Sequence, residues 1–103
     1  MVEIEFRDYG WGGELTARGH AGSGEYGQDA VCAGVSALLV TLARRLEGRA
    51  GCRAELRPGR AHIAFLRRGR AAQDVDFTLC GLRWIAAENP QYAKLTETRE
   101  TGR

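Results

Sequence analysis

The chain has 103 residues, of which 44% are hydrophobic and 27% charged, with a net charge of +2. These values are typical of one ordinary globular domain and exclude a disordered or fibrous protein. No stretch approaches the ~20 apolar residues that a transmembrane helix needs, and the acidic, alternating N-terminus does not resemble a signal or transit peptide. We therefore expect a cytoplasmic protein with no membrane partner.

The first part of the chain predicts a hairpin, a loop and the start of a helix. Apolar and polar residues alternate over 2–9 and 14–20 on either side of the turn YGWGG, which predicts two half-buried strands. Residues 21–28 contain too much glycine for regular structure, so we expect a mobile loop there. From Asp29 onward apolar residues recur at helical spacing, and Asp29 is the candidate N-cap.

A second hairpin follows this helix. The helix is expected to end at the glycine at position 48 or 51, because glycine readily adopts the backbone conformation that closes a helix. Residues 52–58 and 60–68 then read as two strands joined by a Pro-Gly turn.

A second helix and a polar tail complete the chain. Apolar residues recur at helical spacing over 71–89, and Pro90 ends the helix because proline lacks the backbone donor. Residues 95–103 are polar, so we expect a frayed tail. The order strand–strand–helix–strand–strand–helix predicts a single small domain over 1–103 of the α/β (α+β) class, with two helices on a mostly antiparallel sheet.

The cysteines do not form a recognisable metal or disulfide pattern. Cys32, Cys52 and Cys80 are widely spaced, which favours reduced thiols over a disulfide framework. The sequence contains neither Cys-x-x-Cys nor His-Glu-x-x-His, so we expect no metal and no cofactor. Cys52 and Cys80 are expected to be core or edge thiols without a chemical role.

Positive charge is concentrated in the middle of the chain. Nine arginines lie between Arg44 and Arg70 against only Glu47 and Glu55, a composition that suits RNA or an acidic partner. No aromatic residue is interleaved with them, so the stacking surface of a single-strand RNA binder is missing and we do not expect direct nucleic-acid binding. A non-catalytic ribosome- or RNA-associated module that uses these arginines stays open as the alternative function.

A histidine and a cysteine stand at two expected element ends. His20 ends the second predicted strand, and Cys32 lies three residues after the candidate N-cap. A thiol attacks as the thiolate, which a helix N-terminus and a nearby histidine both favour. Amides at the helix start would also receive the oxyanion of a tetrahedral intermediate. Ser36, one turn after Cys32, would form hydrogen bonds near the thiolate or the histidine.

The glycines between these residues fit a substrate-admitting loop. Gly22, Gly24 and Gly27 would allow the segment to open for a peptide and then exclude water. The physical argument leaves two interpretations open, because a thiol redox sensor on Cys32 would not need His20, whereas a protease needs both.

One stretch carries a family resemblance. GHAGSGEYGQDAVCAGVSALL (19–39) resembles the signature of the bacterial ribosomal-processing cysteine proteases, the Prp family, with a Gly-His-Ala motif, a glycine-containing loop and Asp-x-x-Cys-Ala-x-Val-Ser. LCGLRWIAAENPQY (79–92) is similar to the closing helix of the family, and the resemblance covers nearly the whole chain. It implies that Cys32 is the nucleophile and His20 the base and acid, with Asp29 and Ser36 in support.

The resemblance also implies a substrate and a quaternary structure. Members of this family remove a short N-terminal extension from large-subunit ribosomal protein number twenty-seven, cutting after an apolar motif that contains an aromatic residue. The expected partner is therefore the N-terminal peptide of a ribosomal protein precursor. The resemblance further implies a homodimer, and we expect Trp84, on the second predicted helix, in the core or in that interface.

Overall fold

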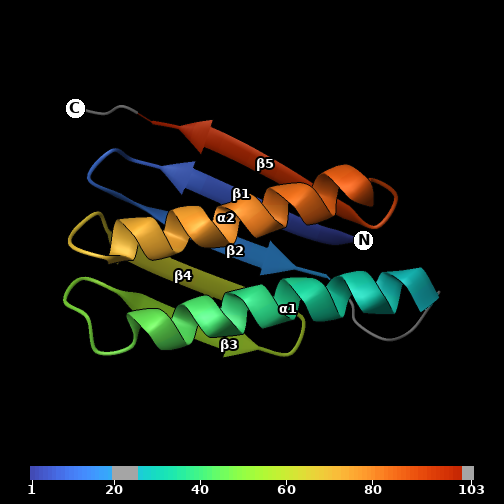
Figure 1. Cartoon of the computed structure of the whole chain (residues 1–103), viewed down its shortest axis with the longest axis horizontal. Coiled ribbons are helices and arrows are strands. Elements are labelled where there is room, and N and C mark those ends of the chain that lie inside the picture. The colour runs from blue at the N-terminus through green and yellow to red at the C-terminus, as the bar shows by residue number, and fades with distance from the viewer. Residues whose placement is uncertain (20–25, 101–103) are drawn as a thin grey trace.

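The computed structural model describes residues 1–19 and 26–100 (Figure 1). This part of the chain contains five strands and two helices, joined by short connections. In chain order the elements are β1 (Val2–Asp8), β2 (Gly12–Arg18), α1 (Tyr26–Leu46), β3 (Arg53–Arg57), β4 (Arg60–Leu66), α2 (Ala71–Glu88) and β5 (Ala93–Arg99).

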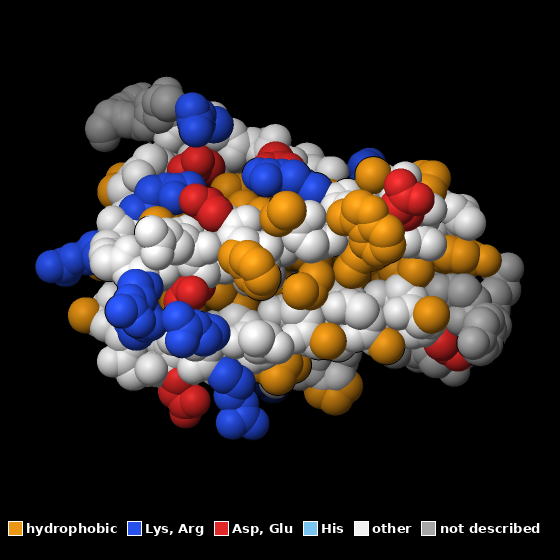
Figure 2. Space-filling view, in the orientation of Figure 1, with side chains coloured by type: hydrophobic (Ala, Val, Ile, Leu, Met, Phe, Trp, Pro, Cys, Tyr) orange, Lys and Arg blue, Asp and Glu red, His pale blue; other side chains and the backbone are white. Residues whose placement is uncertain are grey.

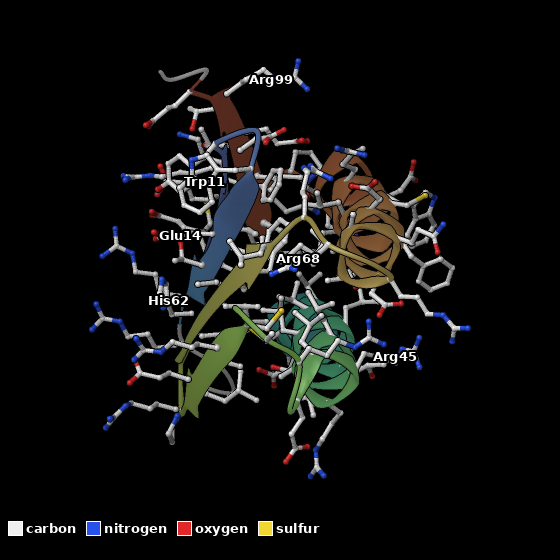
Figure 3. All side chains as sticks on the ribbon, turned by 90° about the vertical axis from the view of Figure 1, so that its left-hand side faces the viewer. Trp11, Glu14, Arg45, His62, Arg68 and Arg99 are labelled. Carbon is white, nitrogen blue, oxygen red and sulfur yellow. The ribbon has the colours of Figure 1, made fainter. Side chains whose placement is uncertain are left out.

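The strands form one sheet in the order β3-β4-β2-β1-β5. The pairs β1–β2, β2–β4 and β3–β4 are antiparallel, and β1–β5 is parallel. Both helices cover the same face of this sheet (Figures 1 and 3), so the domain has two layers. The expected fold class, two helices on a mostly antiparallel sheet, is confirmed, as are both predicted hairpins.

The alternation along the strands places the core between the two layers. On β1 the side chains of Val2, Ile4 and Phe6 are buried under the helices, whereas Glu3 and its neighbours at every second position face away from them. Burial of each large apolar side chain contributes about 1.5–3 kcal/mol. The sheet supplies further buried residues, which meet apolar positions of α1 and α2: Leu15, Ala17, Ile63 and Phe65 face Val35, Leu39, Leu42, Val75, Leu79 and Leu82.

Helix α1 begins three residues earlier than the sequence pattern predicted. Tyr26, Gly27 and Gln28 are already helical, so the expected loop does not extend to residue 28, and Gly27 belongs to the helix. Asp29 lies in the first turn and is not the N-cap, although its negative charge there still suits the helix dipole. One glycine costs a helix only about 1 kcal/mol, which the buried face of a 21-residue helix outweighs. Gly22 and Gly24 lie outside the described residues.

The C-terminal segment is a strand rather than a frayed tail. Residues 93–99 form β5 and pair in parallel with β1, with Ala93 opposite Val2 and Arg99 opposite Asp8. Its sequence is polar because only Ala93 and Leu95 pack against the core. Backbone pairing with β1 needs no apolar side chain, so hydropathy did not reveal it. Residues 101–103 of the predicted tail lie outside the described part.

The helix ends agree with the local sequence signals. Helix α1 ends at Leu46, and Gly48 follows with a φ of 79°, the conformation that glycine adopts most readily. Helix α2 ends at Glu88, two residues before Pro90. Within residues 1–19 and 26–100, neither helix combines the length and the hydropathy needed to cross a membrane.

Candidate active site

Cys32 lies on the sheet-facing side of α1. It is the seventh residue of that helix, and only 7% of its surface is exposed. It lines a pocket of about 130 Å³ between α1 and the end of the sheet where β2 stops and β3 turns into β4. Ser36 and Leu39 form the helix wall of the pocket with Cys32, and Gly19 and Leu56 contribute to the opposite wall.

The size of the pocket limits what it can receive. A cavity of about 150 Å³ holds a molecule as small as benzene, so this pocket of about 130 Å³ has room for one side chain and not for a length of peptide. Its walls include the apolar side chains of Leu39 and Leu56, and burial of an apolar group there is favourable. The geometry therefore suits a peptide that lies across the surface and inserts one apolar side chain beside Cys32.

The residues expected to support Cys32 lie along the same helix. Asp29 is three residues before it and Ser36 four residues after it, and both spacings place side chains on one face of a helix. Both residues are exposed, whereas Cys32 is buried. Ser36 lines the pocket, which Asp29 does not. The helix thus brings Ser36 to the same cavity as Cys32.

The early start of α1 changes the expected role of the helix N-terminus. The first four amides of a helix lack intrahelical partners, and the dipole acts mainly over the first turn. As the seventh residue, Cys32 is beyond that turn, and its amide belongs to the regular helical ladder. The expectation that amides next to Cys32 form an oxyanion site at the helix start is therefore wrong.

Gly19, the residue before His20, sits in a tightly packed corner. A Cβ atom on Gly19 would lie 2.8 Å from the carbonyl oxygen of Met1 and 2.9 Å from Cα of Val2, closer than side chains tolerate. Its amide donates a hydrogen bond to the carbonyl of Gly59, with N and O 3.1 Å apart. Gly19 therefore joins the end of β2 to the β3–β4 turn at the wall of the pocket. His20 itself lies outside the described residues.

The second histidine of the chain belongs to another surface. His62, on β4, lies 3.2 Å from a carboxylate oxygen of Glu14 on the side of the sheet that the helices leave open (Figure 3). Tyr9 donates a hydrogen bond of 3.3 Å to the same carboxylate and stacks on Trp11 with ring centroids 5.2 Å apart. None of these four side chains lines the pocket that contains Cys32.

Of the other two cysteines, one lies where the sequence predicted and one does not. Cys52 is half-buried and packs against the core, as expected, but Cys80 is exposed on α2 and not in its apolar stripe. All three cysteines lie in the described part of the chain, and no disulfide joins them. Within that part, no group of three or more His, Cys, Asp or Glu is placed to hold a metal ion.

The sequence did not indicate that residues of β3 and β4 form one wall of the pocket. Leu56 and Ala61 each stand between two polar residues on a strand, so the side of the strand on which they lie was readable. The helix that this side would face was not. The contact is long-range, because α1 packs against β3 and β4. Only the packing of α1 makes these residues part of the site.

Comparisons with known proteins agree on one family. The family model described as Cysteine protease Prp matches residues 1–94. The crystal structure of a ribosomal processing protease Prp from S. aureus with a substrate peptide is 25% identical, with a TM-score of 0.79, and the match covers 94% of this chain and 99% of that one.

Two further crystal structures are similar over nearly their whole length. The same S. aureus protease with a covalently linked product peptide is 26% identical, with a TM-score of 0.76, covering 94% of this chain and 99% of that one. SMU.848 from Streptococcus mutans is 27% identical, with a TM-score of 0.75, covering 96% and 95%. No curated protein matches the chain.

Proposed function

This chain belongs to the Prp family of cysteine proteases, and from that premise we propose that Cys32 is its nucleophile and His20 its general base and acid. The observation that carries this proposal is the placement of Cys32 in a pocket whose opposite wall includes Gly19, the residue bonded directly to His20. Adjacent Cα atoms are about 3.8 Å apart. The support for His20 is therefore that it follows directly in the chain from a residue of the pocket wall.

The other histidine does not compete for this role. His62 is engaged with Glu14 on the open side of the sheet, with 3.2 Å between the ring nitrogen and the carboxylate oxygen. The chain has two histidines. A cysteine protease needs a proton acceptor within reach of the thiol, so His20 is the candidate.

The proposed reaction has two steps. The imidazole of His20 takes the thiol proton of Cys32 while Sγ attacks the carbonyl carbon of the scissile bond, and the C–N bond then breaks as His20 returns the proton to the leaving amine. Water, deprotonated by His20, hydrolyses the resulting thioester and regenerates the thiol. The S. aureus relative with a covalently linked product peptide supports a covalent route.

Asp29 and Ser36 are proposed as supporting residues on the same face of α1. Ser36 has the stronger support, because it is exposed and lines the pocket together with Cys32. Asp29 lies one turn before Cys32 and is exposed. A carboxylate there would orient a histidine and stabilise its charged form.

We propose the N-terminal extension of large-subunit ribosomal protein number twenty-seven as the substrate, processed in the cytoplasm. The similar S. aureus protein is a ribosomal processing protease that binds a substrate peptide. The pocket beside Cys32 has the volume for one apolar side chain, which agrees with cleavage at an apolar motif.

We further propose that the protease is a homodimer that buries the outer face of α2. Phe77 and Trp84 are 80% and 65% exposed, and their spacing of seven residues places them on one side of that helix. Hydrophobic side chains gather over the helical face of the molecule (Figure 2). The test is the molar mass in solution: wild type is expected at twice the monomer mass and Phe77→Asp/Trp84→Asp at the monomer mass, and a monomeric wild type overturns the proposal.

The assignment of the catalytic residues is tested by cleavage of a peptide that spans the extension of the precursor. We expect cleavage by the wild-type protein and its loss by at least 10³-fold in Cys32→Ala and in His20→Ala. The matched controls are Cys80→Ala, which removes an exposed thiol, and His62→Ala, which removes the other imidazole. Both controls are expected to cleave like wild type.

Two results would contradict this assignment. Undiminished cleavage by Cys32→Ala excludes the proposed nucleophile, and cleavage that depends on Cys32 but not on His20 excludes the proposed base. Retention of RNA at moderate salt without any cleavage would favour the RNA-associated module instead.

A further inference from the structure

Three arginines form one row across neighbouring strands. Arg57 on β3 is opposite Arg60 on β4, and Arg60 is in turn opposite Arg18 on β2. Strands lie about 4.8 Å apart, so the row spans about 10 Å. Residues directly opposite each other point to the same face, and Leu56, Ala61 and Ala17, the residues next to these arginines, face the helices. The three guanidinium groups therefore belong to the open face.

This row contains three like charges, and the one carboxylate that continues it is Glu3, opposite Arg18 on β1. Like charges directly opposite each other destabilise a sheet. In residues 1–19 and 26–100, six other arginines have a carboxylate partner, but Arg18, Arg57 and Arg60 have none. All three are exposed. Three neighbouring arginines that form no ion pair within the described residues are a candidate for binding an anionic group from outside.

The row lies at the mouth of the Cys32 pocket. Arg18, Arg57 and Arg60 belong to the same pocket wall as Gly19 and Gly59, at the end of the sheet where β2 stops. All three residues line the pocket, and the strand alternation directs their side chains toward the open face. A peptide anchored at Cys32 that continues over this end of the sheet meets the row after a few residues, since an extended chain advances about 3.3 Å per residue.

We propose that Arg18, Arg57 and Arg60 form a subsite that binds a carboxylate side chain of the substrate, a few residues from the scissile bond. The inference rests on the proposed protease function and adds a determinant of specificity to it. Arginine is suited to this task because its planar group binds a carboxylate with two parallel hydrogen bonds.

The neighbouring rows favour a peptide carboxylate over RNA. The next row on the open face contains Glu55 and Glu5, and Glu3 lies opposite Arg18 itself. A phosphate backbone running across the sheet would meet these carboxylates, which repel it. The cationic surface is therefore confined to one row at one end of the sheet and matches a single anionic side chain rather than a polyanion.

The experiment uses peptides that span the precursor extension and carry Glu, Gln or Lys at one position at a time. With the wild-type protein we expect one position at which Glu lowers KM about fivefold relative to Lys, with kcat unchanged. Arg60→Gln removes this preference, and Arg60→Glu reverses it in favour of Lys. Arg60→Gln is also expected to raise the melting temperature by about 1–4 °C, because the like-charge contacts are relieved.

Arg53→Gln is the matched control. Arg53 lies on the same strand and face as Arg57 but is opposite Ala64, so it is outside the row, and it does not line the pocket. This variant is expected to keep the wild-type preference for Glu. Salt at 0.5 M is expected to reduce the preference in the wild-type protein, because the subsite is exposed.

Binding of the same peptides to Cys32→Ala, measured by fluorescence anisotropy, separates this inference from the proposed function. A preference for Glu in binding supports the subsite even if no cleavage occurs, whereas Cys32-dependent cleavage with equal KM for Glu and Lys at every position overturns the subsite alone. The subsite is also overturned if Arg53→Gln and Arg60→Gln change the preference for Glu over Lys to the same extent. Binding of a single-stranded RNA oligonucleotide that Arg60→Gln abolishes, with no charge preference among peptides, would assign the row to RNA.

Discussion

The guanidinium of Arg83 donates two hydrogen bonds to the carboxylate of Glu97, of 2.8 and 2.9 Å. Arg83 lies on α2 and Glu97 on β5, so this pair fixes the last strand to the helix layer. The hydrogen bonds from Arg83 lower the pKa of the Glu97 carboxyl, although partial burial acts in the opposite sense. Glu97 belongs to the C-terminal segment that hydropathy alone would leave unstructured.

Removing the charge of Glu97 is expected to loosen β5. Glu97→Gln should lower the free energy of unfolding by about 0.5–1 kcal/mol, because both side chains are partly exposed and solvent weakens the pair. Chemical denaturation at pH 7 measures the change, and Glu88→Gln, on the same helix as Arg83, is the control. Because the pKa of Glu97 is lowered in the folded state, the deficit should disappear as the pH falls below its ordinary value of 4.5. A deficit that persists at pH 2 would contradict the ionic origin.

Asp8 is expected to make stability depend on pH. Burial would raise the pKa of its carboxyl, but the hydrogen bond from the Gly10 amide and the charges of Arg67 and Arg99 outweigh burial and leave it lowered. Stabilisation from a carboxyl with a lowered pKa is present above its ordinary value and is lost as the pH falls through the folded-state value.

Asp8→Asn should therefore destabilise the protein by about 1 kcal/mol at neutral pH and by progressively less below about pH 4. The side-chain oxygen of asparagine can still accept the hydrogen bond from the Gly10 amide. The difference in stability between the two proteins therefore reports the loss of the negative charge. Urea denaturation at several pH values measures the difference, with Asp76→Asn, whose side chain is 62% exposed, as the control. A constant difference between pH 2 and pH 7 would exclude the proposed linkage.

Gly19 is expected to be required for peptide cleavage as well as for stability, because it forms part of the pocket wall. Gly19→Ala places a Cβ 2.8 Å from the Met1 carbonyl oxygen, so the end of β2 must move away from the first strand. We expect a loss of about 1–3 kcal/mol in stability and a decrease in kcat/KM of at least tenfold under conditions where the variant is fully folded. Steady-state cleavage and thermal unfolding of the same preparation provide the two measurements.

A second glycine serves as the control for this substitution. Gly34 lies in α1, where a Cβ would be 3.4 Å from a methyl group of Ile85 and meets ordinary packing. Gly34→Ala is expected to keep activity and to stabilise the helix by up to about 1 kcal/mol. If both variants lose activity to the same extent, close packing at Gly19 is not the cause.

Ser36 is expected to affect catalysis without affecting stability. The residue is exposed and lines the pocket with Cys32, so Ser36→Ala should lower kcat/KM about tenfold and change the unfolding free energy by less than about 0.5 kcal/mol. Thr41→Ala removes another exposed hydroxyl of α1, which bonds the Ala37 carbonyl at 2.7 Å and lies outside the pocket. Thr41→Ala should have the kcat/KM of the wild-type protein. If Ser36→Ala also has the wild-type kcat/KM, Ser36 does not take part in catalysis.

The sequence by itself determined the elements whose signals are local. Alternation of apolar and charged residues identified β1 and β2, and glycine and proline marked the C-terminal ends of α1 and α2. The spacing of Cys32 and Ser36 placed them one turn apart on one helix face. Each of these signals depends on a residue and its near neighbours in the chain. The family resemblance, carried by the stretch 19–39, was equally readable, and the family match over residues 1–94 confirms it.

Only the tertiary structure decided three other features. Strand β5 exists because its backbone pairs with β1, about ninety residues away, and such pairing leaves no hydropathy signal. The pocket at Cys32 exists because α1 packs over the end of β2 and the β3–β4 turn. The arginine row requires the register that aligns Arg18, Arg60 and Arg57. Long-range pairing and packing set these positions, so the order of residues along the chain could not reveal them.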